Sequence, residues 1–152
     1  MNIEPLKNLL ASKSGFVGTV IVLAITIAAL FASYIAPFDP VDTDFANQLK
    51  GPSASHLLGT DELGRDILSR IIFGSRISIV TGVGSVIISL LLGGLIGLIA
   101  GYYRGWFEFF AMRIMDLMMA FPYLLLALLI LATFGNGTSK VILTIGIVYV
   151  PI

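Results

Sequence analysis

Few side chains in this sequence could carry out chemistry. The chain has 152 residues, with nine Lys and Arg, nine Asp and Glu, one histidine and no cysteine. A single histidine, His56, is too little for a histidine metal centre or a Ser-His-Asp triad, so we interpret it as a loop residue near a membrane surface. The lack of cysteine excludes disulfides and thiolate metal sites. We therefore predict no catalytic residue, no metal ligand and no cofactor.

Acidic and basic residues do stand at helical spacing in one short stretch. Two pairs are four residues apart with the acid first: Asp61 with Arg65, and Asp66 with Arg70. This is the favourable order for ion pairs along a helix. Thr60 could cap such a helix, and Asp61 would favour the positive end of its dipole. We predict a short amphipathic helix from Thr60 along the membrane surface, with its start left open by Gly64.

A further charged pair, Arg113 and Asp116, is three residues apart at the entrance of an apolar run. Charges near lipid are costly and are usually paired or functional. We interpret them as an interfacial ion pair that fixes a helix end; the alternative is contact with a solute or a partner. Pro122 is predicted to kink the same helix. No GxxxxGK[ST] phosphate loop is present, so we predict that the chain is not itself an ATPase or another enzyme.

Long apolar runs must position these residues. Of the chain, 57% is hydrophobic and only 12% is charged, and the mean hydropathy is +1.00. No Asp, Glu, Lys or Arg occurs in residues 14–38, 77–103 or 117–139. Each run exceeds the roughly 20 residues that a helix needs to cross a bilayer, where continuous helices satisfy the backbone. The predicted fold class is an all-α integral membrane protein, a multi-span helical bundle.

The apolar runs also predict the organisation of the chain. We expect a cytoplasmic N-terminus (1–13), a first transmembrane helix (14–36), an extracytoplasmic segment with an interfacial helix (37–76) and the start of a transmembrane domain (77–152). A fourth run begins at Val141 and is too short to span, so we expect three complete helices plus a truncated fourth, in a fragment of a longer protein. The distribution of Lys and Arg slightly favours an inside N-terminus.

Small residues recur at every fourth position of the second run. The stripe consists of Thr81, Ser85, Ser89, Gly93, Gly97 and Gly101. Small side chains let helix backbones approach closely, and helices in lipid associate through such packing. Two interpretations remain open: a seam against a partner subunit, or packing within the same bundle.

Two motifs resemble those of ABC permeases of the dipeptide, oligopeptide and nickel group. The first is the run HLLGTDELGRD at residues 56–66, whose signature residues are His56, Gly59, Thr60, Asp61, Gly64, Arg65 and Asp66. The second is the run MRIMDL at 112–117, which leads into AFP at 120–122. The single span before the polar segment is similar to the N-terminal region of the second permease type of this group.

This resemblance implies a membrane-spanning permease subunit of an ATP-binding-cassette importer for peptides or related small solutes, working by alternating access. It implies an inner (cytoplasmic) membrane location with a cytoplasmic N-terminus. The implied partners are a second permease subunit, two cytoplasmic ATPase subunits and an extracytoplasmic solute-binding protein. The formal net charge of zero gives no indication of nucleic acid. The alternatives are a non-transporting membrane anchor or assembly protein, or an inactive truncated remnant.

Overall fold

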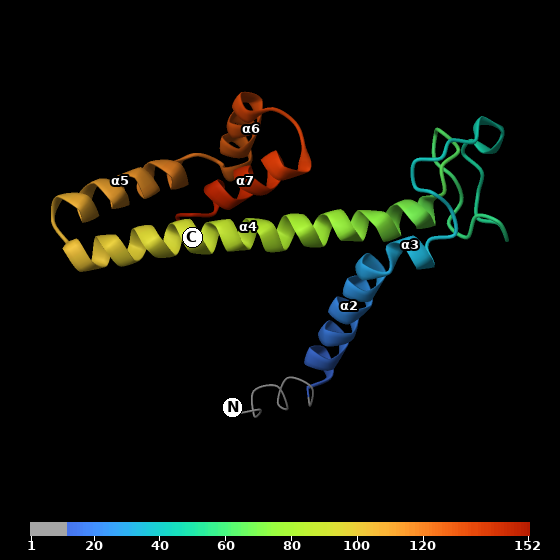
Figure 1. Cartoon of the computed structure of the whole chain (residues 1–152), viewed down its shortest axis with the longest axis horizontal. Helices are drawn as coiled ribbons and strands as arrows, with labels where there is room; N and C mark the ends of the chain where they lie inside the picture. Colours follow the sequence, from blue (N-terminus) through green and yellow to red (C-terminus); the bar gives the residue numbers. More distant parts are fainter. Residues whose placement is uncertain (1–11) are drawn as a thin grey trace. The chain divides into compact units, whose positions relative to one another are not determined.

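The computed structural model describes residues 12–152, and its regular elements are helices (Figure 1). They are α2 (Lys13–Leu30), α3 (Ala32–Ile35), the 3-10 helix η1 (Phe45–Asn47), α4 (Ile67–Tyr103), α5 (Trp106–Ala120), α6 (Tyr123–Phe134) and α7 (Thr138–Val148). Within the described residues the only β pairing is an isolated bridge between Thr60 and Asp66. The predicted all-α class is therefore confirmed.

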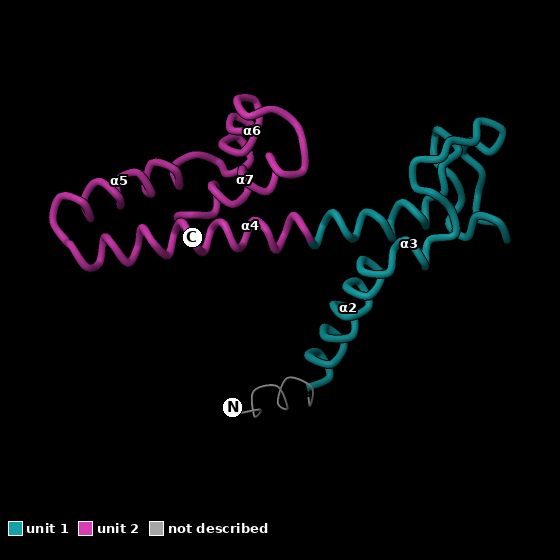
Figure 2. Tube along the Cα trace, viewed as in Figure 1, with its two compact units in different colours: residues 1–79 teal, residues 80–152 magenta. Residues whose placement is uncertain are grey.

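The chain divides into two compact units, Met1–Ile79 and Val80–Ile152 (Figure 2). Helix α4 contributes its beginning to the first unit and its remainder to the second. The predicted cytoplasmic N-terminus, 1–13, lies almost wholly outside the described residues.

In the first unit, α2 is an apolar helix with a polar cap. The hydroxyl of Ser12 accepts a hydrogen bond from the backbone N–H of Gly15 at 3.1 Å, which satisfies one of the free donors at the helix start. Only 6% of α2 is buried, so the side-chain surface of this helix is available to lipid. A break at Phe31 separates α2 from α3, and the predicted first span is formed by these two helices.

The polar segment 37–66 consists mainly of turns, and the prediction of a helix that starts at Thr60 is wrong. Helix α4 begins at Ile67. Gly64 has a φ of +75°, a left-handed conformation that does not fit within a right-handed helix. Thr60 is instead drawn into the bridge with Asp66. The charged residues that we expected along one helix therefore lie in a turn that precedes a helix.

Helix α4 is the longest element, with 37 residues. At 1.5 Å per residue this corresponds to about 56 Å, well beyond the roughly 30 Å of bilayer hydrocarbon. Arg70 and Arg76 lie near its beginning, before the uncharged run that starts at Ile77. The apolar part is thus the continuation of a helix that starts in the polar segment. Only 11% of an apolar 18-residue stretch of this helix is buried.

In the second unit, the third apolar run is not one continuous helix. Helices α5 and α6 are bent by 101° where Phe121 and Pro122 separate them. Proline lacks the N–H of a helical hydrogen bond and pushes the preceding residue toward extended backbone. Phe121 has φ −86° and ψ 140°, in agreement with this effect. Pro122 therefore produces a break where a kink was predicted.

Helices α6 and α7 contact one another across a short glycine turn (Figure 1). Gly135 and Gly137 both have positive φ, +84° and +134°, which glycine adopts without steric cost. Helix α7 has 11 residues, or about 16 Å, and is too short to cross a bilayer. Two described helices, α2 and α4, are long and apolar enough to span, or three spans result if the bent α5–α6 pair counts as one.

Candidate functional site

The first candidate region is the signature turn, residues 56–66, whose glycines lie against other backbone segments. Gly59 has φ +79°, and a Cβ added there would lie 2.4 Å from the carbonyl oxygen of Lys50. A Cβ on Gly64 would lie 1.8 Å from the carbonyl oxygen of Asp44. No side chain fits at either position. Both glycines therefore allow another backbone segment to lie directly against the turn.

Asp61 is the charged centre of this turn. Its carboxylate accepts hydrogen bonds from the backbone N–H groups of Leu63 at 2.9 Å and Arg65 at 3.0 Å. The Arg65 guanidinium pairs with it at 2.7 Å. The Arg70 guanidinium forms a second ion pair with the same carboxylate. The hydrogen bond from the Arg65 side chain is the main reason that the pKa of Asp61 lies well below its usual value. The predicted Asp61–Arg65 pair is present, but in a turn, and Arg70 pairs with Asp61 where we had expected Asp66.

Asp66 caps helix α4 and binds His56. One carboxylate oxygen accepts from both the N–H and the hydroxyl of Ser69 at 2.8 Å, and the other lies 3.0 Å from Nδ1 of His56. Burial opposes ionisation of Asp66, but these hydrogen bonds outweigh that effect and lower its pKa. The cap of α4 is thus Asp66 and not Thr60.

Thr60 has a different role in the same turn. Its hydroxyl donates to the carbonyl of Asn47 and accepts from the N–H of Lys50 at 3.0 Å. The side chain is buried, with 4% of the residue exposed. Thr60 therefore connects the turn to the segment that follows η1.

The second candidate region is the small-residue stripe on α4, and half of it packs within the second unit. The hydroxyls of Ser85 and Ser89 donate to the carbonyls of Ile142 at 3.2 Å and Tyr149 at 2.9 Å. A Cβ on Gly93 would lie 2.7 Å from the carbonyl oxygen of Val150. This part of the stripe is the surface on which α7 and the residues after it rest.

The last two glycines of the stripe face open space. A Cβ on Gly97 or Gly101 meets nothing within 4 Å among the described residues. Gly97 also borders a groove of about 720 Å³ between α4, α5 and the segment after α7. Met112 and Met115 of α5 and Tyr149 line the same groove. The groove is mostly apolar, so it can hold side chains or an apolar solute but offers little for catalysis.

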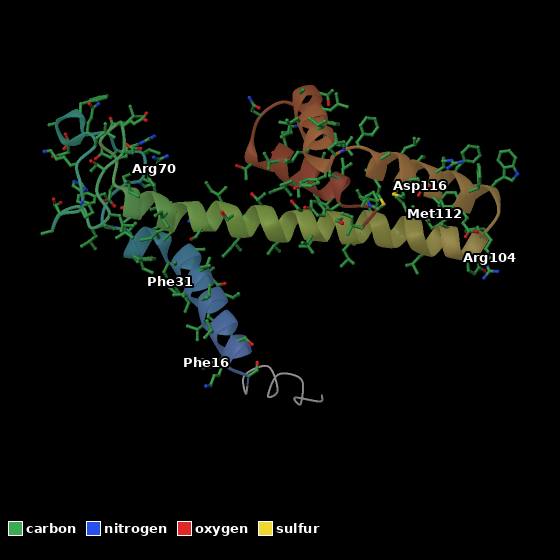
Figure 3. All side chains as sticks on the ribbon, turned by 180° about the vertical axis from the view of Figure 1, so that it is seen from behind. Phe16, Phe31, Arg70, Arg104, Met112 and Asp116 are labelled. Atoms are coloured by element: carbon green, nitrogen blue, oxygen red, sulfur yellow. The ribbon has the colours of Figure 1, made fainter. Side chains whose placement is uncertain are left out.

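Arg113 and Asp116 lie on α5. Met112, which lines the groove, belongs to the same helix, and Figure 3 labels it together with Asp116. Their closest charged atoms are 3.9 Å apart, and both side chains are about two-thirds exposed. The Arg113 guanidinium also lies 5.9 Å from the centre of the Phe109 ring, within the range of a cation–π contact. The predicted partners are therefore neighbours in a loose pair.

Sequence reasoning missed two features of the second unit. The partner of the stripe is α7, and its matching glycine is Gly146, where a Cβ would lie 2.6 Å from the side chain of Ile88. Gly146 stands in the apolar run that begins at Val141. Thr144 of α7 is fully buried, and its hydroxyl has no hydrogen-bond partner among residues 12–152. No group of three metal-ligating side chains comes together within that range.

These features define a multi-pass helical membrane protein with a polar, tightly built turn and a small-residue packing face. Residues 5–52 match the family model of the N-terminal TM domain of oligopeptide transport permease C. The chain is 41% identical over 149 residues to the dipeptide transport system permease protein DppC of Alkalihalophilus pseudofirmus, covering 98% of this chain and 49% of that protein.

Two further relatives show the same pattern. The di/tripeptide transport system permease protein DppC of Pseudomonas aeruginosa is 44% identical over 146 residues, covering 92% of this chain and 48% of its own length. The glutathione transport system permease protein GsiD of Pectobacterium atrosepticum is 42% identical over 131 residues, covering 86% and 44%. The chain spans about half the length of the curated relatives it matches. The predicted resemblance is confirmed: the chain aligns with about half of each of these transport permeases, and its residues 5–52 match an N-terminal permease domain.

Proposed function

We propose that this chain forms part of the membrane-spanning permease subunit of an ATP-driven importer for peptides or related small solutes. The observation that carries the proposal is the alignment of 98% of the chain, at 41% identity, with a permease named for dipeptide transport. The extensive exposed apolar surface of α2 and α4 supports a place in lipid. The chain would supply helix packing and part of the path wall, and no catalytic step.

In this proposal, ATP is hydrolysed by two separate cytoplasmic subunits, and a second permease subunit completes the path. The chain lies in the inner membrane with its N-terminus in the cytoplasm. The segment 37–66 faces outward, toward a solute-binding protein. The span count would be three, with α5 and α6 together forming the third and α7 starting a fourth. Alternating access would move these helices between inward-open and outward-open states.

The transport proposal is tested by deleting the gene that encodes this chain and measuring uptake of a radiolabelled dipeptide and of labelled glutathione by the cells. We expect uptake of at least one of them to fall, to be restored by the gene, and to depend on ATP. Normal uptake of these and of longer peptides, together with purification free of any ATPase subunit, would favour the membrane-anchor alternative.

The orientation is tested separately, because the chain contains no cysteine and single cysteines can be introduced. Ala54 is exposed in the polar segment, and Tyr103 is exposed at the end of α4. We expect a membrane-impermeant maleimide to label Ala54→Cys in intact cells and to label Tyr103→Cys only after the membrane is opened. The reverse pattern would invert the proposed topology without touching the transport proposal.

A further inference from the structure

Four residues from three stretches of the first unit form a closed circuit: Phe38, His56, Asp66 and Ser69. The backbone N–H of Phe38 donates to the hydroxyl of Ser69 at 3.1 Å. That hydroxyl in turn donates to Asp66 at 2.8 Å. His56 lies 3.0 Å from the other oxygen of Asp66. The circuit closes where the rings of Phe38 and His56 meet, with centroids 4.8 Å apart.

The circuit is shielded from water at its centre. Asp66 is 2% exposed and Ser69 is fully buried, and the His56 side chain is 14% exposed. Hydrogen bonds in such surroundings are stronger than those that compete with water, and each member supports the next. In contrast, the Arg113–Asp116 pair is about two-thirds exposed, with its charges 3.9 Å apart.

The four residues lie at the ends of two helices and in the segment that connects them. Phe38 follows α3, the last helix of the first apolar run, whereas Ser69 lies in the first turn of α4. The two are 31 residues apart in sequence but directly hydrogen-bonded. His56 sits midway through the intervening segment. The circuit therefore ties the exit of one membrane helix to the entrance of the next, and it anchors the connecting segment at both.

We propose that this circuit is a rigid joint that makes the end of the first span and the beginning of α4 move as one body. The joint is a property of the first unit alone and does not depend on the identity of a solute. In a permease, the joint would keep the end of the first span at a fixed position relative to the beginning of α4. His56, Asp66 and Ser69 act here as positioning residues.

The test uses the whole protein in lipid nanodiscs, with spin labels on cysteines introduced at Tyr34 and Ile77. Tyr34 is 89% exposed and Ile77 is 58% exposed, and both belong to the first unit. Pulsed electron paramagnetic resonance gives the distribution of the distance between the labels. We expect one narrow distribution for the parent and a clearly broader one for Asp66→Ala. Amide exchange at Phe38 should become about 100-fold faster or more, because a buried pair is broken.

Two further variants keep the test decisive. Ser69→Ala removes the hydrogen bond from the N–H of Phe38 but leaves the His56–Asp66 pair and the ring contact of Phe38 with His56. It is the deciding variant if Asp66→Ala fails to fold. Asp42→Ala is the control, since it removes one carboxylate from an exposed position of the same segment. Unchanged distance width and amide exchange in folded Ser69→Ala or Asp66→Ala would overturn the joint. The readouts are independent of transport, so that result would leave the proposed function standing.

Discussion

Gly93 offers the sharpest test of how the second unit is packed. A Cβ at this position would lie 2.7 Å from the carbonyl oxygen of Val150 and 3.7 Å from its carbonyl carbon. Ordinary van der Waals contacts of a Cβ begin near 3.4 Å. Gly93→Ala must therefore push α4 and the segment after α7 apart by several tenths of an ångström. The obstacle is backbone, so no side-chain rotation relieves it.

The neighbouring glycine provides a matched control. Gly94 is on the same turn of α4, and a Cβ added there meets nothing within 4 Å. Replacing a mid-helix glycine by alanine removes chain entropy from the unfolded state and is worth roughly 0.5–1 kcal/mol. Overpacking costs typically about 1–3 kcal/mol. We expect Gly93→Ala to lower the free energy of unfolding by about 1–2 kcal/mol and Gly94→Ala to raise it by about 0.5–1 kcal/mol.

The assay is equilibrium unfolding in mixed micelles titrated with a denaturing detergent, followed by circular dichroism. The difference between the two variants is the quantity of interest, since both share the intrinsic gain in helix propensity. Equal free energies of unfolding for Gly93→Ala and Gly94→Ala would refute the close approach of α4 to Val150. Packing of the stripe would then have to be assigned to a surface outside the chain.

Four more outcomes follow from the described contacts. Gly97→Leu should leave the chain folded but reduce the yield of complex with a partner permease on a native gel, because Gly97 faces open space; an undiminished yield contradicts this. Asp116→Ala should reduce the folded fraction in membranes, and Arg113→Ala should restore it if the two only neutralise one another. Thr144→Val should raise the free energy of unfolding by roughly 1 kcal/mol, since a buried hydroxyl without a partner is removed; a loss of stability would reveal a partner. The lowered pKa of Asp66 adds stability that is complete above its unfolded value of 3.8 and is lost as the pH falls through the folded value; acid unfolding of Asp66→Asn should lack this component.

The apolar runs were predictable because charged side chains are costly in hydrocarbon, and this cost shows directly in the composition of a span. The start of α4 was not. The pairs around Asp61 fit the spacing of a helix, but the same four-residue spacing also fits a turn in which a side chain reaches back to its own backbone. Gly64 decides between them through its positive φ, which depends on the approach of Asp44 from 20 residues earlier. Nothing local in the sequence shows that approach.

The third apolar run shows a similar limit. Pro122 predicted a disturbance, but its size depends on whether neighbouring elements hold the two halves in line. In the second unit α6 contacts α7, and the α5–α6 bend reaches 101°. The chain therefore has a full break at Pro122, and α6 packs against α7 beyond it. A proline in a single sequence gives the position of such a change more reliably than its angle.

The small-residue stripe left two interpretations open, and the structure shows an occupied part, Ser85 to Gly93, and an open part, Gly97 and Gly101. Ser85, Ser89 and Gly93 contact α7 or the segment after it, where each serine hydroxyl reaches a backbone carbonyl. The carbonyl of Tyr149 lies past the end of α7 and accepts from the backbone N–H of Ile152 at 3.2 Å, so the hydroxyl of Ser89 is a second donor to it. A serine, and not another glycine, is useful there because it donates a hydrogen bond. Gly97 and Gly101 contact no such carbonyl and need only be small, which is the property that a second helix would require of them.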